Sequence, residues 1–228
     1  MQEISSQLQQ VLSRIAQACD QCGRKQDEVT LLAVSKKQTI EAIHTAYQAG
    51  QFHFGENYVQ EALDKIHALA HLPITWHLIG ALQSNKTAEV AQHFAWVHSI
   101  DRLKIAQRLS AQRPNGLPPL QICLQVNIDQ QDSKSGCTVE ELPTLIKAIL
   151  PLPNLVLRGL MIIPQAQNHQ AFMQLAQLRE HLLATIPQLS PQVFDTLSMG
   201  MSDDLEPAIA AGSTLVRVGT AIFGQRNN

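Results

Sequence analysis

The sequence is poor in charged and in aromatic side chains. Charged residues make up 16% and aromatic residues 4% of the 228 residues, and the formal net charge is −2. Without excess positive charge a chain has little attraction for a phosphate backbone, and with few aromatic rings it has little on which bases can stack. We therefore expect no nucleic-acid partner.

Long apolar runs and a secretory leader are also missing. No apolar run reaches the roughly 20 residues that a membrane-spanning helix needs. The first ten residues, MQEISSQLQQ, lack both the basic and the apolar region of a signal peptide. These absences predict a cytoplasmic protein that has no membrane partner.

Two pairs of residues have the spacing of metal or redox motifs but lack the rest of such a motif. Cys19 and Cys22 form a C-x-x-C at the end of a predicted helix, and no second pair follows at zinc-ribbon spacing. His67 and His71 are four residues apart on a predicted helix, but no glutamate follows His67 as in zinc proteases. We interpret both pairs as structural or surface residues and expect no metal.

Strands and helices alternate along the whole chain. Apolar residues at helical spacing predict a leading amphipathic helix over 3–21. Eight short apolar segments follow, and a predicted helix separates each from the next. The strands are predicted at 29–34, 52–54, 75–79, 96–100, 120–126, 155–162, 194–198 and 214–218, and the helices at 38–49, 57–70, 84–94, 102–112, 139–150, 168–186 and 203–211.

This alternation predicts parallel strands joined by right-handed crossovers. Eight strand–helix units in 228 residues come close to the roughly 250 residues of a typical closed (β/α)8 barrel. An open doubly wound sheet is the alternative. We expect an α/β protein, a (β/α)8 TIM barrel with an extra N-terminal helix, in one domain spanning 1–228.

The carboxyl ends of barrel strands carry the functional residues of this fold. Lys36 and Lys37 follow the first strand, and because side chains alternate, only one of the two points inward. A desolvated lysine amine is a nucleophile for carbonyl groups. Arg217 lies in an otherwise apolar strand, where a buried guanidinium needs an acceptor. A neighbouring carboxylate or exposure at the strand end is the alternative interpretation of Arg217.

The loops after the seventh and eighth strands have the composition of an anion site. Ser198 and Thr220 supply hydroxyl donors, while Gly200 and Gly219 let backbone N–H groups approach an anion closely. Phosphates often bind at these two loops in barrels. The sequence therefore predicts a phosphate cradle here.

A second interpretation of the seventh loop is structural. Asp203 can cap the helix that follows, and Glu206 stands at the third position of a capping box. Capping and anion binding are compatible, since they can use different N–H groups. A lysine, an anion cradle and an arginine at one barrel mouth together suggest a phosphorylated aldehyde, and pyridoxal 5′-phosphate (PLP) fits each part.

The motifs together resemble those of the pyridoxal phosphate homeostasis proteins, a family of single-domain PLP-binding barrels similar to the N-terminal barrel of bacterial alanine racemases. The resemblance runs essentially end to end. It rests on 31–36 (LLAVSK), 54–61 (FGENYVQE), 77–86 (HLIGALQSNK), 133–136 (SKSG), 158–161 (RGLM), 197–204 (LSMGMSDD) and 216–224 (VRVGTAIFG).

The resemblance implies a role for each matched residue. It implies that Lys36, rather than Lys37, binds PLP covalently as a Schiff base and that Arg217 meets the pyridine nitrogen. The residues implied to hold the phosphate are Ser198, Gly200, Gly219 and Thr220. Those implied to line the cofactor or lie near its pocket are Asn57, Met161, His77, Ser84 and Asn85.

Two features weigh against efficient catalysis. A guanidinium keeps its own proton, so the pyridine nitrogen stays neutral and PLP becomes a weaker electron sink. Racemisation also needs a second base, which in the resembling racemases is a tyrosine from a C-terminal domain. Only eleven residues follow Arg217 here, and Tyr47 and Tyr58 belong to early predicted helices.

We therefore expect a monomeric PLP carrier, not an enzyme, that maintains vitamin B6 and amino-acid pools. Its partners are PLP and, as acceptors, PLP-dependent apo-enzymes or free amines. The alternatives are an amino-acid racemase and a regulatory interaction module that uses PLP only structurally.

Overall fold

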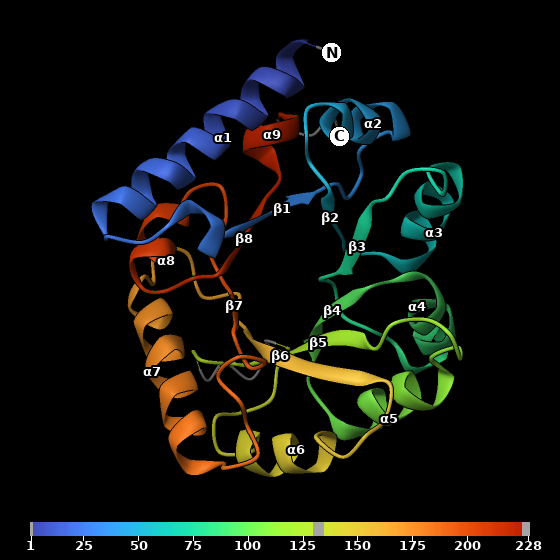
Figure 1. The fold of residues 1–228 in the computed structure, drawn as a ribbon, viewed down its shortest axis with the longest axis vertical. Helices are drawn as coiled ribbons and strands as arrows, with labels where there is room; N and C mark the ends of the chain where they lie inside the picture. Colours follow the sequence, from blue (N-terminus) through green and yellow to red (C-terminus); the bar gives the residue numbers. More distant parts are fainter. Residues whose placement is uncertain (1, 130–134, 225–228) are drawn as a thin grey trace.

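Eight parallel strands close into a barrel in the computed structural model, which describes residues 2–129 and 135–224. Each strand pairs with the next, and the last strand pairs with the first (Figure 1). The strands are β1 (Thr30–Val34), β2 (His53–Glu56), β3 (Thr75–Leu78), β4 (Trp96–Ile100), β5 (Leu120–Gln125), β6 (Leu155–Met161), β7 (Thr196–Ser198) and β8 (Leu215–Val218). The expected (β/α)8 barrel is confirmed, and the pairing of β1 with β8 excludes the open sheet.

Helices surround the barrel in the predicted order. They are α1 (Gln2–Gln21), α2 (Ile40–Gln48), α3 (Val59–Ala68), α4 (Thr87–His93), α5 (Leu103–Gln112), α6 (Leu142–Ile149), α7 (Gln170–Thr185) and α8 (Leu205–Ala210). Two short helical segments lie outside the predicted helices: η1 (Gln26–Glu28) and α9 (Thr220–Phe223). The first turn of the helix predicted over 84–94 forms a separate short segment, η2 (Ser84–Lys86). The extra helix α1 lies across α8 and α9 (Figure 1).

Alternating side chains divide the apolar residues between two sides of the strands. Leu31 and Ala33 of β1 belong to the main core, which packs between the barrel and its helices. Leu32 belongs instead to a small separate cluster with Ile79 and Leu215, against which Val34 packs. These four side chains lie inside the barrel, so residues of the same parity on β1 and β8 face its interior.

The capping box expected at α8 is wrong. The N-cap residue is Asp204, not Asp203, and its Oδ1 atom accepts the backbone N–H of Met201 at 2.6 Å. Glu206 does not reach back to the helix start, because both its carboxylate oxygens accept hydrogen bonds from Arg14 of α1 at 2.7 and 3.0 Å. A contact with a distant helix has replaced the local one.

Over the described ranges 2–129 and 135–224, the structure contains no helix with the length and apolar character that crossing a membrane requires.

Candidate functional site at the carboxyl ends of the strands

Most of the predicted site residues meet at the carboxyl ends of six neighbouring strands. Ser198 at the end of β7 pairs with Met161 at the end of β6. The backbone N–H of Arg217 on β8 donates to Gly200 O at 2.9 Å. A Cβ atom on Gly219 would lie 3.2 Å from Val34 O, so the ends of β8 and β1 are close as well.

Arg217 is the best-defined member of this group. Its side chain is 4% exposed and has no carboxylate partner among the described residues. Nη1 donates to Ser198 O at 2.6 Å and to Ser198 Oγ at 2.8 Å, and Nη2 donates to Ile162 O at 2.8 Å. A guanidinium has five N–H groups, so two remain for another acceptor. The expected alternative, pairing with a neighbouring carboxylate, is not what the structure shows.

The charge on Arg217 is maintained although the residue is buried. Burial lowers the pKa of Arg217 to about 10, while the more distant carboxylate of Asp204 acts in the opposite direction. At neutral pH the guanidinium is therefore still protonated, and it presents a fixed positive charge and free donors to whatever lies beside it. A neutral ring nitrogen or another acceptor without its own proton is the group that such donors suit.

The structure separates Lys36 from Lys37. Lys36 follows Val34 by two residues and thus has the parity of the side chains inside the barrel, and it is half-buried. Lys37 is exposed, its φ angle is 60°, and its backbone N–H donates to a carboxylate oxygen of Glu61. This geometry favours Lys36 as the lysine that points into the mouth of the barrel.

A buried ion cluster holds the backbone next to Lys36. Lys65 of α3 donates from Nζ to Ser35 O at 2.7 Å, to Glu56 Oε1 at 2.8 Å and to Glu61 Oε1 at 2.6 Å. The hydroxyl of Ser35 donates to the same Glu56 oxygen at 2.6 Å. Burial raises the pKa of Glu56, and the hydrogen bonds from Lys65 and Ser35 lower it in part. The peptide before Lys36 is therefore fixed from behind.

Asn57 carries a polar atom that the described residues leave unsatisfied. Its Oδ1 atom is buried and has no hydrogen-bond partner among them. The loop that holds Asn57 packs tightly on the loop after β3, where a Cβ atom on Gly80 would lie 2.1 Å from Asn57 O. Because a buried amide oxygen normally has a donor, Asn57 is a candidate to contact a bound molecule.

The remaining predicted residues are less closely connected to this group. Thr220, exposed, begins α9 directly after Gly219. Ser84, half-exposed, and Asn85, exposed, lie on η2 after β3. Their roles stay predictions, as does that of Met161, which is fully buried. Ser133 and Lys134 of the 133–136 motif lie outside the described residues.

His77 lies deeper in the barrel than the sequence suggested. Its Nδ1 atom is 3.0 Å from Nε2 of His98, and its Nε2 atom is 3.0 Å from Nδ1 of His53. Nδ1 of His98 is in turn 2.8 Å from Ser198 Oγ. Three imidazoles on β2, β3 and β4 thus lead to the serine that holds Arg217.

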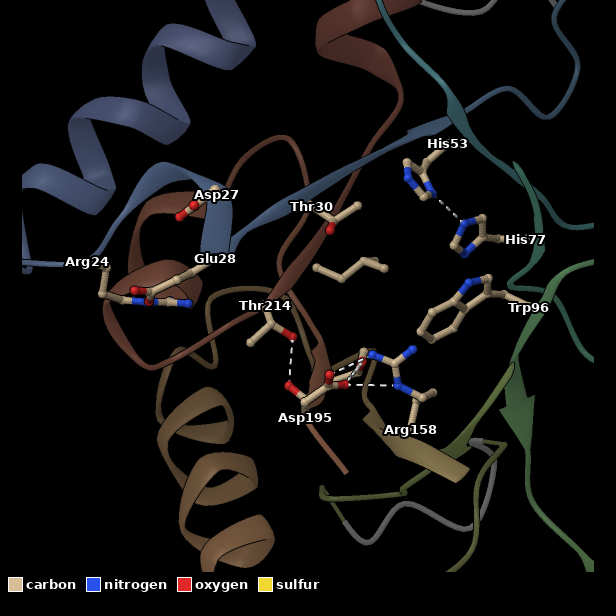
Figure 2. Close-up of a pocket in the computed structure, with 12 residues that line it drawn as sticks. Arg24, Asp27, Glu28, Thr30, His53, His77, Trp96, Arg158, Asp195 and Thr214 are labelled. Atoms are coloured by element: carbon tan, nitrogen blue, oxygen red, sulfur yellow. Dashed lines mark hydrogen bonds and ion pairs between the residues drawn. The ribbon is translucent and has the colours of Figure 1, made fainter. Parts of the chain in front are cut away.

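This file of histidines begins at a cavity on the opposite end of the barrel. The cavity has a volume of about 410 Å³ and is lined by residues that start strands, among them Thr30, His53, Trp96 and Thr196. Figure 2 shows His53, His77 and Trp96 along one wall of it. Arg158 lies over the Trp96 ring at 5.1 Å and pairs with Asp195 at 2.6 Å. We call this the N-terminal cavity.

The sequence could not reveal these histidines and the ion cluster as sites. His53 and His98 lie in predicted strands, and Glu56 lies in the 54–61 motif. Nothing in the local sequence pattern shows which polar side chains face one another across neighbouring strands. The alternation of side chains along each strand would show it, but only once the register between the strands is known. His53 and His77 are opposite Thr75 and Gly55 in the β2–β3 pairing, so the two rings lie on one diagonal.

The described part of the chain, 2–129 and 135–224, contains no group of three or more His, Cys, Asp or Glu residues arranged to hold an ion. Cys19 is buried and Cys22 is exposed, although both lie at the end of α1 or just beyond it.

Gly200 is expected to be intolerant of a side chain. Its φ angle is +94°, and a Cβ atom would lie 2.6 Å from Cβ of Ala208 on α8. Gly200→Ala should therefore combine backbone strain with a clash and lower the free energy of unfolding by about 2–4 kcal/mol. Chemical denaturation measures this loss.

Gly212→Ala is the matched control for Gly200. Gly212 has a φ angle of +103°, but its Cβ would approach no side chain closer than 4.0 Å, the distance to Ala176. It should show only the strain, about 1 kcal/mol. Equal losses at the two glycines would contradict a tight contact between the Gly200 loop and α8.

Comparison with known proteins identifies the fold and the family of this chain. Residues 7–227 match the alanine racemase N-terminal domain family. Among solved structures, the alanine racemase of Corynebacterium glutamicum has the same barrel, with a TM-score of 0.72 at 13% identity; the match covers 100% of this chain and 62% of that one. At this identity the likeness concerns the fold alone.

Other relatives are much more similar over their full length. The pyridoxal phosphate homeostasis proteins of Pseudomonas aeruginosa and Escherichia coli are 55% and 51% identical to this chain, over 100% of it and 97% and 98% of theirs. PipY of Synechococcus elongatus, solved with PLP bound, is 38% identical with a TM-score of 0.80, over 92% of this chain and 100% of its own. The chain belongs to the pyridoxal phosphate homeostasis protein family.

Proposed function

We propose that this protein binds PLP at the carboxyl ends of its strands, holds it covalently through Lys36, and passes it on without efficient catalysis. Its relatives carry the name homeostasis protein, and PipY binds PLP. The observation that carries the proposal is Arg217, a buried and protonated guanidinium with N–H groups left over.

The residues present fit the cofactor. Arg217 suits a pyridine nitrogen that carries no proton, and the unsatisfied Asn57 Oδ1 suits a hydroxyl or other donor on the ring. Gly200 and Gly219 lie where a Cβ atom would meet neighbouring chain, and with Thr220 they would hold the phosphate. The Ser198 hydroxyl, already bonded to Arg217 and beside His98, would act on the cofactor through Arg217. Met161 and, at a greater distance, His77, Ser84 and Asn85 would complete the surroundings.

An arginine beside the pyridine nitrogen would limit which reactions PLP can support. PLP, when bound, supplies an aldehyde for amines and an electron sink for carbanions, and a strong sink needs a protonated pyridine nitrogen. Arg217 retains its own proton, with a pKa of about 10, and so donates a hydrogen bond instead of a proton. Lys36 could still capture the aldehyde reversibly. Removal of an α-proton from a bound amino acid would be slow, because the neutral pyridine nitrogen stabilises the resulting carbanion only weakly.

The two tyrosines do not alter this conclusion. Tyr47 of α2 packs edge-on against Phe52 with ring centroids 5.5 Å apart. Tyr58 precedes α3 and is 56% exposed. Neither has a contact with Arg217 or Ser198 among the described residues, so no second base opposite Lys36 is evident there. We also propose that the protein works as a monomer, as the sequence predicts.

The proposal is tested by measuring transfer and proton exchange on one preparation. Protein loaded with PLP should activate the apo-form of a PLP-dependent enzyme, or release PLP to an added free amine. In D₂O it should exchange the α-proton of L-alanine no faster than free PLP does. Exchange that is faster and lost in Lys36→Ala would favour a racemase instead. A set of captured proteins that changes with cofactor occupancy, without transfer, would favour a regulatory module.

A further inference from the structure

His53, His77 and His98 form a continuous hydrogen-bonded file through the barrel. The file begins at the N-terminal cavity and ends on Ser198 Oγ, and all three ring-to-ring or ring-to-hydroxyl distances are 2.8–3.0 Å. Ser198 Oγ also accepts a hydrogen bond from Arg217 Nη1 at 2.8 Å. The cavity and the proposed cofactor partner are therefore joined by a single chain of contacts.

The buried members of the file are neutral imidazoles. Burial, with smaller effects of His98 and His53, lowers the pKa of His77 well below its usual value. Burial and the charge on Arg217 lower the pKa of His98 to about 3. Burial also lowers the pKa of His53, which is only half-buried. A neutral imidazole has one N–H donor and one bare nitrogen, so each contact fixes which atom donates.

Only two arrangements of protons satisfy all the contacts. In the first, every ring carries its proton on Nε2: His98 donates to His77, His77 donates to His53, and the Ser198 hydroxyl donates to His98 Nδ1. In the second, every ring carries its proton on Nδ1, and His98 donates to Ser198 Oγ. A mixed arrangement would place two donors or two bare nitrogens against each other.

The Ser198 hydroxyl decides between them. In the second arrangement Ser198 Oγ accepts from both His98 and Arg217, and its own proton has no acceptor among the described residues. A buried donor without an acceptor is disfavoured. The first arrangement is therefore the resting one, with His53 Nε2–H directed away from the file at the N-terminal cavity.

We propose that the three histidines are positioning residues that orient the Ser198 hydroxyl, and through it Arg217. We further propose that adding a proton to His53 reverses the direction of every hydrogen bond in the file. A doubly protonated His53 must donate through Nδ1. The Nε2 proton of His77 passes to Nδ1 of His53, the Nε2 proton of His98 passes to Nδ1 of His77, and the Ser198 hydroxyl proton passes to Nδ1 of His98. One proton from water restores the hydroxyl, His77 and His98 stay neutral, and Ser198 Oγ then accepts from both His98 and Arg217. The consequence for PLP rests on the proposed role of Arg217.

The charged groups around His53 come from several elements. Arg24 precedes η1, and Asp27 and Glu28 lie within it. Arg158 of β6 and Asp195 before β7 form an ion pair in the same cavity. Three carboxylates and two guanidinium groups line the cavity, so it does not repel a proton on His53. Burial of His53 and the loss of an acceptor for the Ser198 hydroxyl are what oppose the reversal.

Two-bond ¹H–¹⁵N NMR spectra of the histidine rings test the proposal, because they distinguish protonated from bare ring nitrogens. In protein without cofactor at pH 8, His53, His77 and His98 should all carry their proton on Nε2. Acidification should add a proton to His53 and, at the same midpoint, move those of His77 and His98 to Nδ1. His98 on Nδ1 at pH 8, or no reversal after His53 is protonated, would overturn the proposal.

His53→Gln is the decisive variant, since glutamine can accept and donate hydrogen bonds but takes up no proton in this range. In this variant, the ring protons of His77 and His98 should stay on Nε2 when the pH is lowered. Thr30→Val changes the same cavity without contacting the file. In this variant the ring protons of His77 and His98 should move to Nδ1 on acidification, as in the wild type. His67 and His93, whose rings meet at 5.2 Å elsewhere, should give the same ring signals in all three proteins at each pH.

The cofactor supplies a second readout. With PLP bound, its absorbance between pH 8 and pH 5 should contain a transition at the His53 midpoint in wild type and Thr30→Val, and lack it in His53→Gln. The same transition in all three would overturn the coupling to Arg217. Failure of PLP to bind at all would contradict the proposed function while leaving the histidine spectra readable, so the two failures are distinguishable.

Discussion

Lys36→Ala is expected to abolish covalent attachment of PLP, whereas Lys37→Ala keeps it. Lys36 has the parity of side chains inside the barrel and follows a peptide held by Lys65, whereas Lys37 is exposed with its backbone bound to Glu61. Treatment of the loaded protein with borohydride makes the bond to lysine permanent. Intact mass and peptide mapping should then find the added mass on Lys36 in wild type and Lys37→Ala, and on no lysine in Lys36→Ala.

Retention of a reducible adduct in Lys36→Ala would contradict the assignment, as would its loss in Lys37→Ala. Circular dichroism of each variant controls for folding. Since Arg217 and the phosphate cradle do not depend on Lys36, the variant should still bind some PLP non-covalently, and equilibrium dialysis measures that fraction. Covalent attachment of PLP and its non-covalent binding can therefore be measured separately.

Lys65→Met is expected to cost more stability than any change at a surface ion pair. The side chain of Lys65 is 6% exposed and that of Glu56 is 0% exposed. Removing one partner of a buried pair leaves an uncompensated charge, which costs about 3–5 kcal/mol. Chemical denaturation at pH 7 should show a loss of this size.

The loss at Lys65 should shrink as the pH falls. Burial already raises the pKa of Glu56 in the folded protein, and Lys65 lowers it in part; without Lys65 the folded pKa rises further. A carboxyl with a higher pKa folded than unfolded favours the folded state more as it becomes protonated. The difference between variant and wild type should therefore narrow from pH 7 toward the unfolded value near 4.5.

Lys86→Met is the matched control. Lys86 pairs with Glu89 at 3.1 Å, but the two side chains are 33% and 38% exposed. Solvent and salt screen such a pair, so the loss should not exceed about 1 kcal/mol and should vary little with pH. Similar losses at Lys65 and Lys86, or a Lys65→Met loss that grows on acidification, would contradict the burial argument.

The barrel could be predicted because its signal is local and repeated. Each strand is an apolar run with a helix after it, and this alternation identifies parallel pairing regardless of exact boundaries. The wrong predictions also have physical reasons. The Asp203 cap was wrong because the helix begins one residue later, at Asp204. The capping box was wrong because Glu206 binds Arg14, 192 residues away in sequence, and no local pattern contains that partner.

The site could be predicted only as far as motifs and strand ends allow. Lys36, Ser198 and Arg217 follow or occupy identifiable strands, so their common location could be expected. Their partners could not, because a hydrogen bond between strands depends on register. Ser198 was expected to serve a phosphate, yet in the structure its hydroxyl oxygen is already bonded to Arg217 and lies beside His98.

Because the barrel closes between its last and first strands, the proposed cofactor site would report on whether the chain has folded completely. Leu32 and Arg217 pair across the β1–β8 seam. The strand that leads to Lys36 and the strand that carries Arg217 therefore come side by side only when the last strand docks on the first. A chain that has formed seven strands has the lysine but not its charged counterpart. Such long-range closure is a slow, late step in folding. Stable retention of PLP should therefore mark molecules whose seam has closed, and an incompletely closed chain should release it.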